Sequence, residues 1–284
     1  MSDAVASNSD EQSAPPAHAG RSWLSRALDS DIFYSFRRSK LTMVAAAITV
    51  LFFLLGTDEQ GRDVFSAILY GMRISLAVGV AGVIFAGALG IALGLVAGYF
   101  GGAVDGVIMR IADVQLTFPA ILIALLVNGI AKSIFGNRLD ATSMLVVLVI
   151  SIGLSFWVGY ARTVRGSVMV EKNKDYVAAA QLIGLPAPKI MLRHVLPNTM
   201  GPILVIATIN LALAIITEAT LSFLGVGLPD TMPSLGTLIR IGNNYLFAGE
   251  WWIVAFPGLA LGGLILSINL LGDWLRDALN PKLR

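Results

Sequence analysis

The stretch KDYVAAAQLIGLPAPKIMLRHVLPN, Lys174–Asn198, is a polar, punctuated segment between two apolar runs. One face of a short helix is predicted by the i, i+3, i+4, i+7 spacing of Tyr176, Ala179, Ala180 and Ile183. Gly184 is expected to end that helix, because glycine adopts the left-handed conformation at little cost. The small residues in the middle of the face would let another surface approach closely.

Three prolines punctuate the second half of the stretch. Pro186 and Pro188 suit a turn followed by a first helical turn. A second short helix is predicted over 190–195, and Pro197 is expected to mark the entry to the next apolar run. The whole stretch therefore predicts a helix–turn–helix elbow with an apolar ridge. Because an apolar ridge in water is unfavourable unless it is covered, the elbow predicts a protein partner.

The composition places this elbow in a membrane protein. The chain has 284 residues, 56% of them hydrophobic and 13% charged, and its mean hydropathy is +0.78. Soluble domains carry about 25% charged residues. Without cysteine there are no disulfides or thiolate metal sites, and His18 and His194 are too few for a histidine-ligated metal centre. We expect an all-α polytopic membrane protein with no metal or cofactor of its own.

The first forty residues differ from the rest. Residues 1–20 are polar and lack an apolar period, which predicts disorder, and they lack the apolar core of a signal peptide. A short amphipathic helix on the membrane surface is predicted by the spacing of Trp23, Leu24, Ala27 and Leu28. A solvated linker is the alternative. Residues 1–40 are thus expected to form a cytoplasmic tail, and 41–284 the transmembrane domain.

Hydropathy predicts six membrane spans. A transmembrane helix needs about 20 apolar residues, and the candidates are Leu41–Leu55, Ile74–Phe100, Val107–Ala131, Ser143–Ala161, Gly201–Gly225 and Trp252–Leu271. The first span is short. It is either completed by residues missing from this version of the chain or strongly mismatched to the bilayer.

The distribution of basic residues predicts the orientation. With both termini in the cytoplasm, fifteen of the 20 lysines and arginines fall on the inner side, including those of the elbow. The outer side keeps Arg62, Arg73, Lys132, Arg138 and Arg240.

Glycine and proline mark special positions inside two spans. Gly90, Gly94 and Gly98 stand four residues apart, as in a face that lets two helices approach closely in lipid. Pro119 is expected to bend the third span, because it removes a backbone donor. Tight packing is the simpler interpretation of both features, although gating at the Pro119 bend is an alternative.

The elbow stretch resembles the cytoplasmic EAA loop of permease subunits in bacterial binding-protein-dependent ABC importers. Ala178-Ala179-Ala180 precedes Gly184 at the family spacing, and Val195-Leu196-Pro197 closes the motif. The family glutamate is Ala178 here, so any salt bridge made by that glutamate is absent. The resemblance implies an ATPase-coupling role for Tyr176, Ala178, Ala179, Ala180, Ile183, Gly184, Leu185, His194 and Pro197.

Other motifs occur in the same order as in one subfamily. GTDEQGRDVFSAILYGMRISL (56–76), GYFGGAVDGVIMRIADVQLTFPAILIAL (98–125), GYARTVRGSVM (159–169) and TEATLSFLGVGLPDTMPSLG (217–236) resemble the second permease of dipeptide, oligopeptide and nickel importers. The resemblance covers the chain from about residue 41 onward. It implies the six-helix type I permease fold with a coupling helix within about 170–198. Family members usually have a longer external segment before GTDxxGRD.

The same resemblance implies the partners. A second permease would complete the pathway, two ATP-binding subunits would dock on the cytoplasmic elbows, and an extracytoplasmic binding protein would deliver peptide. The chain contains no Gly-x-x-x-x-Gly-Lys-[Ser/Thr] phosphate loop. ATP and Mg²⁺ would therefore be bound by the partner subunits, and this chain would be a translocation subunit of the bacterial inner membrane rather than an enzyme. No nucleic acid is expected as a partner.

Three polar residues within the spans, Asp113, Glu218 and Ser222, are candidates for the transport pathway. Asp113 is expected to pair with Arg110 on the same helix or to line the pathway. Glu218 must face a donor or a cavity, because a carboxylate in lipid is costly. Nearby donors are Thr217, Thr220 and Ser222. A hydrogen-bonding hub and a residue that contacts peptide are both open for Glu218.

On the outer side, Gly61, Arg62 and Asp63 would cap the second span or contact the binding protein. His194 is expected to form a hydrogen bond that fixes the elbow, since no nucleophile lies near it in sequence to make it a catalytic base.

Two other classes of membrane protein compete with an importer subunit. An ion-coupled secondary transporter would need several buried ionisable residues, and Glu218 is the main one in the predicted spans. An intramembrane enzyme would need a metal set or a nucleophile with its base, and neither occurs at useful spacing. Within the importer subfamily, a nickel chelate is the alternative cargo to peptide.

Overall fold

The structure is a computed structural model, and it describes residues 43, 56–58, 61–135 and 140–278. The chain divides into two units, Met1–Leu54 and Leu55–Arg284. In the first unit only Met43 is described, and it is helical. The predicted cytoplasmic tail and all of the predicted first span but Leu55 fall in this first unit. Apart from Met43 they lie outside the described residues, as does Leu55.

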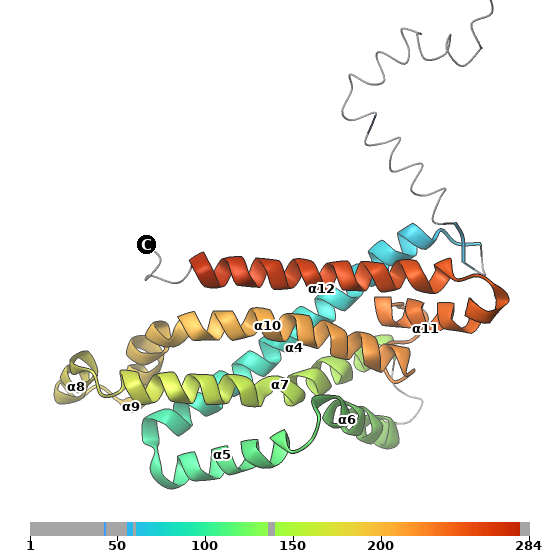
Figure 1. Cartoon of the computed structure of the whole chain (residues 1–284). Helices are drawn as coiled ribbons and strands as arrows, with labels where there is room; N and C mark the ends of the chain where they lie inside the picture. The colour runs from blue at the N-terminus through green and yellow to red at the C-terminus, as the bar shows by residue number, and fades with distance from the viewer. Residues whose placement is uncertain (1–42, 44–55, 59–60, 136–139, 279–284) are drawn as a thin grey trace, which may run out of the picture. The chain divides into compact units, whose positions relative to one another are not determined.

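Long apolar helices make up most of the second unit (Figure 1). Among the described residues, those long and apolar enough to cross a membrane are α4 (Val64–Phe100), α7 (Ala141–Glu171), α12 (Trp252–Ala278) and the helical run Ala187–Phe223, which contains α10 (Leu196–Phe223). They contain the predicted second, fourth, fifth and sixth spans, apart from the last two residues of the fifth. At 37 residues α4 is about 55 Å long, well beyond the roughly 30 Å of a hydrocarbon core.

The predicted third span is sharply bent. Its residues fall in α5 (Gly102–Leu116) and α6 (Ala120–Phe135), which meet at 94° across a short break at residues 117–119. Pro119 lies in the break, as expected for a residue that lacks a backbone N–H. The bend predicted at Pro119 is confirmed, and Val107–Ala131 falls within a bent pair of helices.

Glycines set the seam between α4 and α7. A Cβ atom added at Gly90 would lie 2.4 Å from the Trp157 carbonyl oxygen, and one at Gly94 would lie 2.6 Å from the Ala161 carbonyl oxygen. Gly98 faces Val168 at a similarly short distance. The two backbones therefore approach as closely as the small-residue face predicted.

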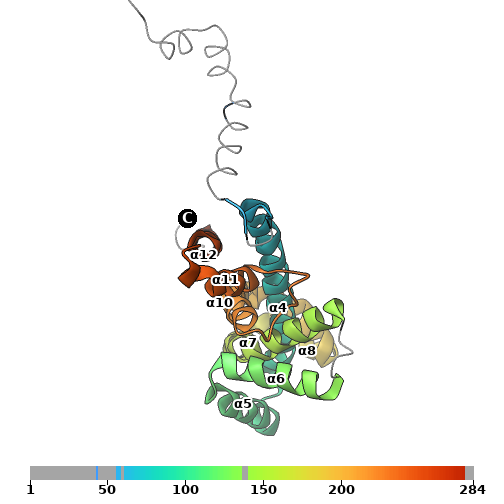
Figure 2. The same cartoon turned by 90° about the vertical axis from the view of Figure 1, so that its right-hand side faces the viewer.

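The remaining helices lie at the two ends of these long helices. The elbow helices α8 (Asp175–Leu182) and α9 (Ala187–Ile190) are at one end, and α11 (Leu235–Tyr245) with its 3₁₀ turn Leu246–Ala248 is at the other (Figure 1). Helix α12 and the α5–α6 pair lie on opposite sides of α7 and α10 in both views (Figure 2). The sequence did not predict α11, which begins at the Ser234 cap and packs on α4, α10 and α12.

Candidate functional site

The turn of the elbow is a closed helix ending. Helix α8 stops at Leu182, and Gly184 has a positive φ of 78°. The Gly184 N–H donates to the Gln181 carbonyl at 2.9 Å, and the Leu185 N–H donates to the Ala180 carbonyl at 3.2 Å. This is the Schellman pattern that glycine permits. The prediction that Gly184 ends the helix is confirmed.

The second arm of the elbow continues directly into the membrane. Pro186 caps α9, a π-helical turn follows over Met191–Val195, and α10 begins at Leu196. Pro197 marks the entry to the span, as predicted, because α10 begins at Leu196 with Pro197 in its first turn. Proline cannot donate the usual backbone bond, but a wider i→i+5 turn carries the helix past it. Ala187–Phe223 is therefore one unbroken helical run of 37 residues.

The two faces of α8 differ from the predicted ridge. Val177 and Ala180 are buried, and together with half-buried Tyr176 they pack against the ends of the long helices. The apolar part of the outward surface is formed by Ala178, Ala179, Leu182 and Ile183. Leu182 is 88% exposed and Ile183 75% exposed. The predicted face of Tyr176, Ala179, Ala180 and Ile183 was thus wrong as a single surface, because tertiary packing takes Tyr176 and Ala180 inward.

Tyr176 ties the elbow to two long helices. Its hydroxyl donates to Glu171 Oε2 at 2.5 Å and accepts from Asn198 Nδ2 at 3.3 Å, so it links the end of α7 to the start of α10. Lys174 Nζ lies 2.6 Å from the other carboxylate oxygen of Glu171. Burial, followed by the hydrogen bond to Glu171, raises the pKa of Tyr176 to about 12. The tyrosine is therefore neutral in ordinary conditions.

His194 does not make the expected bond. Its Nδ1 is buried and has no hydrogen-bond partner in the part of the chain that the structure describes. Its backbone carbonyl accepts from Asn198 Nδ2 at 2.7 Å. The polar contacts that hold the elbow come instead from Tyr176, from Gln181 to the Tyr99 hydroxyl, and from Lys172 to the Gly98 carbonyl.

Glu218 lies at the opposite end of α10 and is 0% exposed. Ser222 Oγ donates to its Oε1 at 2.7 Å, as expected. The Thr217 and Thr220 hydroxyls donate instead to carbonyls of their own helix, Leu213 and Ile216, so the prediction that they assist the carboxylate was wrong. Complete burial favours the hub over direct contact with cargo. Contact of Glu218 or Ser222 with peptide stays a prediction.

Asp113 forms an ion pair with Arg162 of α7 rather than with Arg110. The prediction of a pair within one helix was wrong, because α5 runs beside α7 and presents Asp113 to it. A second pair, Asp105 with Arg165, joins the same two helices. Asp113 remains 54% exposed at its side chain, so a place along the pathway stays a prediction for this residue.

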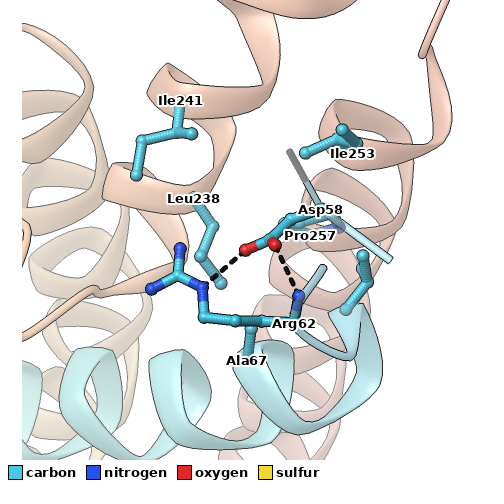
Figure 3. Close-up of a pocket in the computed structure, with 8 residues that line it drawn as sticks. Asp58, Arg62, Ala67, Leu238, Ile241, Ile253 and Pro257 are labelled. Carbon is cyan, nitrogen blue, oxygen red and sulfur yellow. Dashed lines mark hydrogen bonds and ion pairs between the residues drawn. The ribbon is translucent and has the colours of Figure 1, made fainter. Parts of the chain in front are cut away.

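The described residues before α4, 56–58 and 61–63, form hydrogen-bonded contacts with one another. Asp63 caps α4 by accepting from the Ser66 N–H at 2.7 Å, which confirms the capping alternative. Asp58 accepts from the Arg62 side chain at 2.7 Å and from its backbone N–H at 2.8 Å (Figure 3). Gly61 has a positive φ of 73°. The Arg62 pair borders a small apolar pocket between α4, α11 and α12, lined by residues such as Ala67, Leu238 and Ile253 (Figure 3). Contact with a binding protein stays a prediction.

Comparison with known proteins identifies the family. Residues 90–284 match the family described as "Binding-protein-dependent transport system inner membrane component", so the match includes the elbow, Asp113 and Glu218. The chain belongs to this family. It is therefore the inner-membrane component of a binding-protein-dependent transport system, as the motifs of the elbow had indicated.

Similar members of the family carry names that refer to peptides. The dipeptide transport system permease protein DppC of Haemophilus influenzae is 39% identical over 82% of this chain and 75% of its own length. The di/tripeptide transport system permease protein DppC of Pseudomonas aeruginosa is 40% identical over 82% of this chain and 73% of its own length. The glutathione transport system permease protein GsiD of Pectobacterium atrosepticum is 40% identical over 81% of this chain and 73% of its own length.

A solved structure supports the family fold. An inward-facing conformation of the MetNI methionine ABC transporter has a chain that superimposes with a TM-score of 0.57 at 19% identity. The match covers 75% of this chain and 96% of the other. The type I permease fold expected from the motifs is thus confirmed for the described unit, with four or five of the six spans within the described residues.

The sequence analysis did not predict which residues from other helices lie near Glu218. Ser75 comes from α4, and Ser234 caps α11, far from Glu218 in sequence. The available signal was the Ser234 capping position, since serine before an apolar run marks a helix start. Nothing in the local sequence pointed to Ser75.

Proposed function

We propose that this chain is a permease subunit of an ATP-driven importer that moves peptides into the bacterial cytoplasm. The observation that carries the proposal is the elbow, which exposes Leu182 and Ile183 at its turn and whose second arm continues without a break into a membrane-spanning helix. The names of the dipeptide, di/tripeptide and glutathione permeases that are 39–40% identical support a peptide cargo.

The elbow is suited to receive force from a separate motor. Two exposed apolar side chains on a short helix fit a groove on a partner, in the manner of a helix docked by its apolar face. ATP and Mg²⁺ would be bound by that partner, since this chain supplies no phosphate loop. A second permease, two ATP-binding subunits and an external binding protein would complete the assembly. Both termini would lie in the cytoplasm, on the side of the elbow.

Capture of the ATP-binding subunits tests the docking surface. The full chain, co-expressed with its genomic neighbours that encode ATPases, should retain them on purification. Leu182→Asp with Ile183→Asp should lose at least about 90% of the captured ATPase, because two buried charges replace apolar anchors. Phe247→Asp is the matched control: Phe247 is 96% exposed at the other end of the helices, and its variant should capture normally. Equal capture by both variants would contradict the elbow assignment.

Uptake tests the cargo and the energy source. Vesicles that contain the full assembly and its binding protein should accumulate a labelled dipeptide when ATP is inside. Competition by longer peptides, glutathione or a nickel chelate would rank the cargo. Uptake by this chain alone, driven by a proton gradient, would show a secondary transporter instead and would overturn the proposal.

A further inference from the structure

A buried polar cluster joins three helices at the end of the subunit opposite the elbow. Ser75 comes from α4, Glu218 and Ser222 from α10, and Ser234 from the cap of α11. Ser75, Glu218 and Ser234 are 0% exposed and Ser222 is 1% exposed. We call these four residues the outer cluster. Its members lie as far apart as residues 75 and 234 in sequence, so it links elements that the chain does not connect locally.

The hydrogen bonds of the outer cluster join Ser75 and Ser234 to backbone N–H groups of α11, and Ser222 to the carboxyl group of Glu218. Ser75 Oγ accepts from the Leu235 N–H at 3.2 Å, and Ser234 Oγ accepts from the Thr237 N–H at 3.3 Å. Both hydroxyls lie near the Glu218 carboxyl, although its Oε2 has no hydrogen-bond partner among the described residues. Ser234 Oγ also lies 3.3 Å from Thr237 Oγ1. Ser222 donates to Oε1 at 2.7 Å. Glu218 thus faces hydroxyl groups from all three helices that meet here.

The backbones of α4, α10 and α11 pack closely around the outer cluster, so glycines there cannot be replaced by larger residues without a clash. A Cβ atom at Gly236 of α11 would lie 2.2 Å from the Ala219 carbonyl oxygen of α10. One at Gly227 would lie 2.2 Å from Ser222 Oγ, and one at Gly71 of α4 would lie 3.1 Å from the Leu235 nitrogen. Removal of the carboxylate would take away the hydrogen-bond acceptor of the buried Ser222 hydroxyl, which is costly in so closely packed a site.

Helix α10 connects this cluster to the elbow. The helical run Ala187–Phe223 starts in the elbow and carries Glu218 near its other end. The 28 positions from Ile190 to Glu218 span roughly 42 Å of helix. A helix transmits a displacement along its axis better than a loop does. Movement of the elbow would therefore reach the far end of α10, and α11 would move with it only if the two helices are firmly joined.

We propose that Glu218 is a positioning residue that locks α11 onto α4 and α10, so that α11 follows the movement of α10. The direction of that movement, from elbow to outer helix, rests on the proposed function; the lock itself does not. Apolar contacts alone are the competing explanation for the position of α11, because Leu235 and Leu238 also pack against Val64 and Ile68.

Cysteine labelling distinguishes these explanations. The chain has no cysteine, so a single introduced thiol reports cleanly. In Thr237→Cys the thiol is buried on α11 beneath the lock, and in Ala212→Cys it is buried on α10 away from it. Full-length chain in nanodiscs, which leave both membrane faces accessible, would be treated with a water-soluble maleimide. Glu218→Ala should raise the labelling rate at position 237 by about tenfold or more and leave the rate at position 212 unchanged.

Further variants make the test specific to the lock. Glu218→Gln keeps an acceptor of the same shape and should fall between the wild type and Glu218→Ala. Ser75→Ala should raise labelling like Glu218→Ala, and the double variant should exceed neither by much, because both remove the same lock. Unchanged labelling in Glu218→Ala, additive effects in the double variant, or an equal rise at position 212 would each overturn the proposal. Capture of ATPases by Glu218→Ala should be normal, whereas loss of capture in the elbow variant concerns only the proposed function.

Discussion

At the scale of single residues, Tyr176 shows how the elbow is fixed to the helices it would move. One hydroxyl joins the carboxylate at the end of α7 to the amide at the start of α10. Since α8 has only eight residues, it is too short to be stable by itself in water. Its position therefore depends on such side-chain contacts and on the burial of Val177 and Ala180.

Tyr176 predicts a loss of stability at high pH. Its pKa is about 12 in the folded chain and about 10 in an unfolded one. The folded state therefore favours the neutral form, and this contribution is complete below about pH 10 and is lost as the pH rises toward about 12. We expect the apparent Tm of the wild type in detergent to fall more steeply over this range than that of Tyr176→Phe. Parallel curves for the two proteins would contradict this role.

At the scale of elements, the seam between α4 and α7 depends on the absence of side chains. Lipid supplies no hydrophobic force between helices, so close backbone contact and dispersion must hold them together. Gly90 and Gly94 permit that contact over successive turns, and Val164 and Val168 fill the other side of the seam. The same two helices also meet the elbow at their ends, so the seam supports the elbow as well.

A single added side chain in the seam should be damaging. In Gly94→Val a Cβ atom alone would lie 2.6 Å from the Ala161 carbonyl oxygen, which forces the helices apart. We expect a loss of about 1–3 kcal/mol, the usual cost of overpacking, seen as a lower apparent Tm. Gly106→Val on α5 is the control, because no atom lies within 4 Å of a Cβ there. An equal shift for both variants would show that helix propensity, not the seam, is responsible.

The elements also show what the sequence could and could not predict. The long helices follow from hydropathy, and the Gly184 ending follows from glycine's backbone freedom. The 94° break at Pro119 needed information from elsewhere, because Gln115 donates to the Leu154 carbonyl and Ser155 donates to the Ala120 carbonyl on either side of it. Helix α11 was missed since it is too short to resemble a span. Its position depends on Ser75, which lies 160 residues away from Leu235.

At the scale of the whole described unit, the elbow and α11 are two ends of one connection. The π-helical turn at Met191–Val195 lets the helix pass Pro197 without a break. A hydrogen-bonded turn at 183–186 separates Leu182 from the helical run Ala187–Phe223 that forms the span. The outer cluster then joins the far end of that span to α11 and α4. If both joints are rigid, a state change at the elbow must appear at α11.

This connection predicts that nucleotide alters α11 only through an intact elbow. In the reconstituted importer carrying Thr237→Cys, addition of ATP should change the maleimide labelling rate at position 237 several-fold. Combining the reporter with Leu182→Asp and Ile183→Asp should abolish this ATP-dependent change in labelling, because the ATPase no longer binds the subunit. The labelling rate of Ala212→Cys should not change with ATP, whether the elbow is wild-type or variant. An ATP effect that persists in the elbow variant would mean that force enters elsewhere, and its absence in the wild-type elbow would mean that α10 does not carry it to α11.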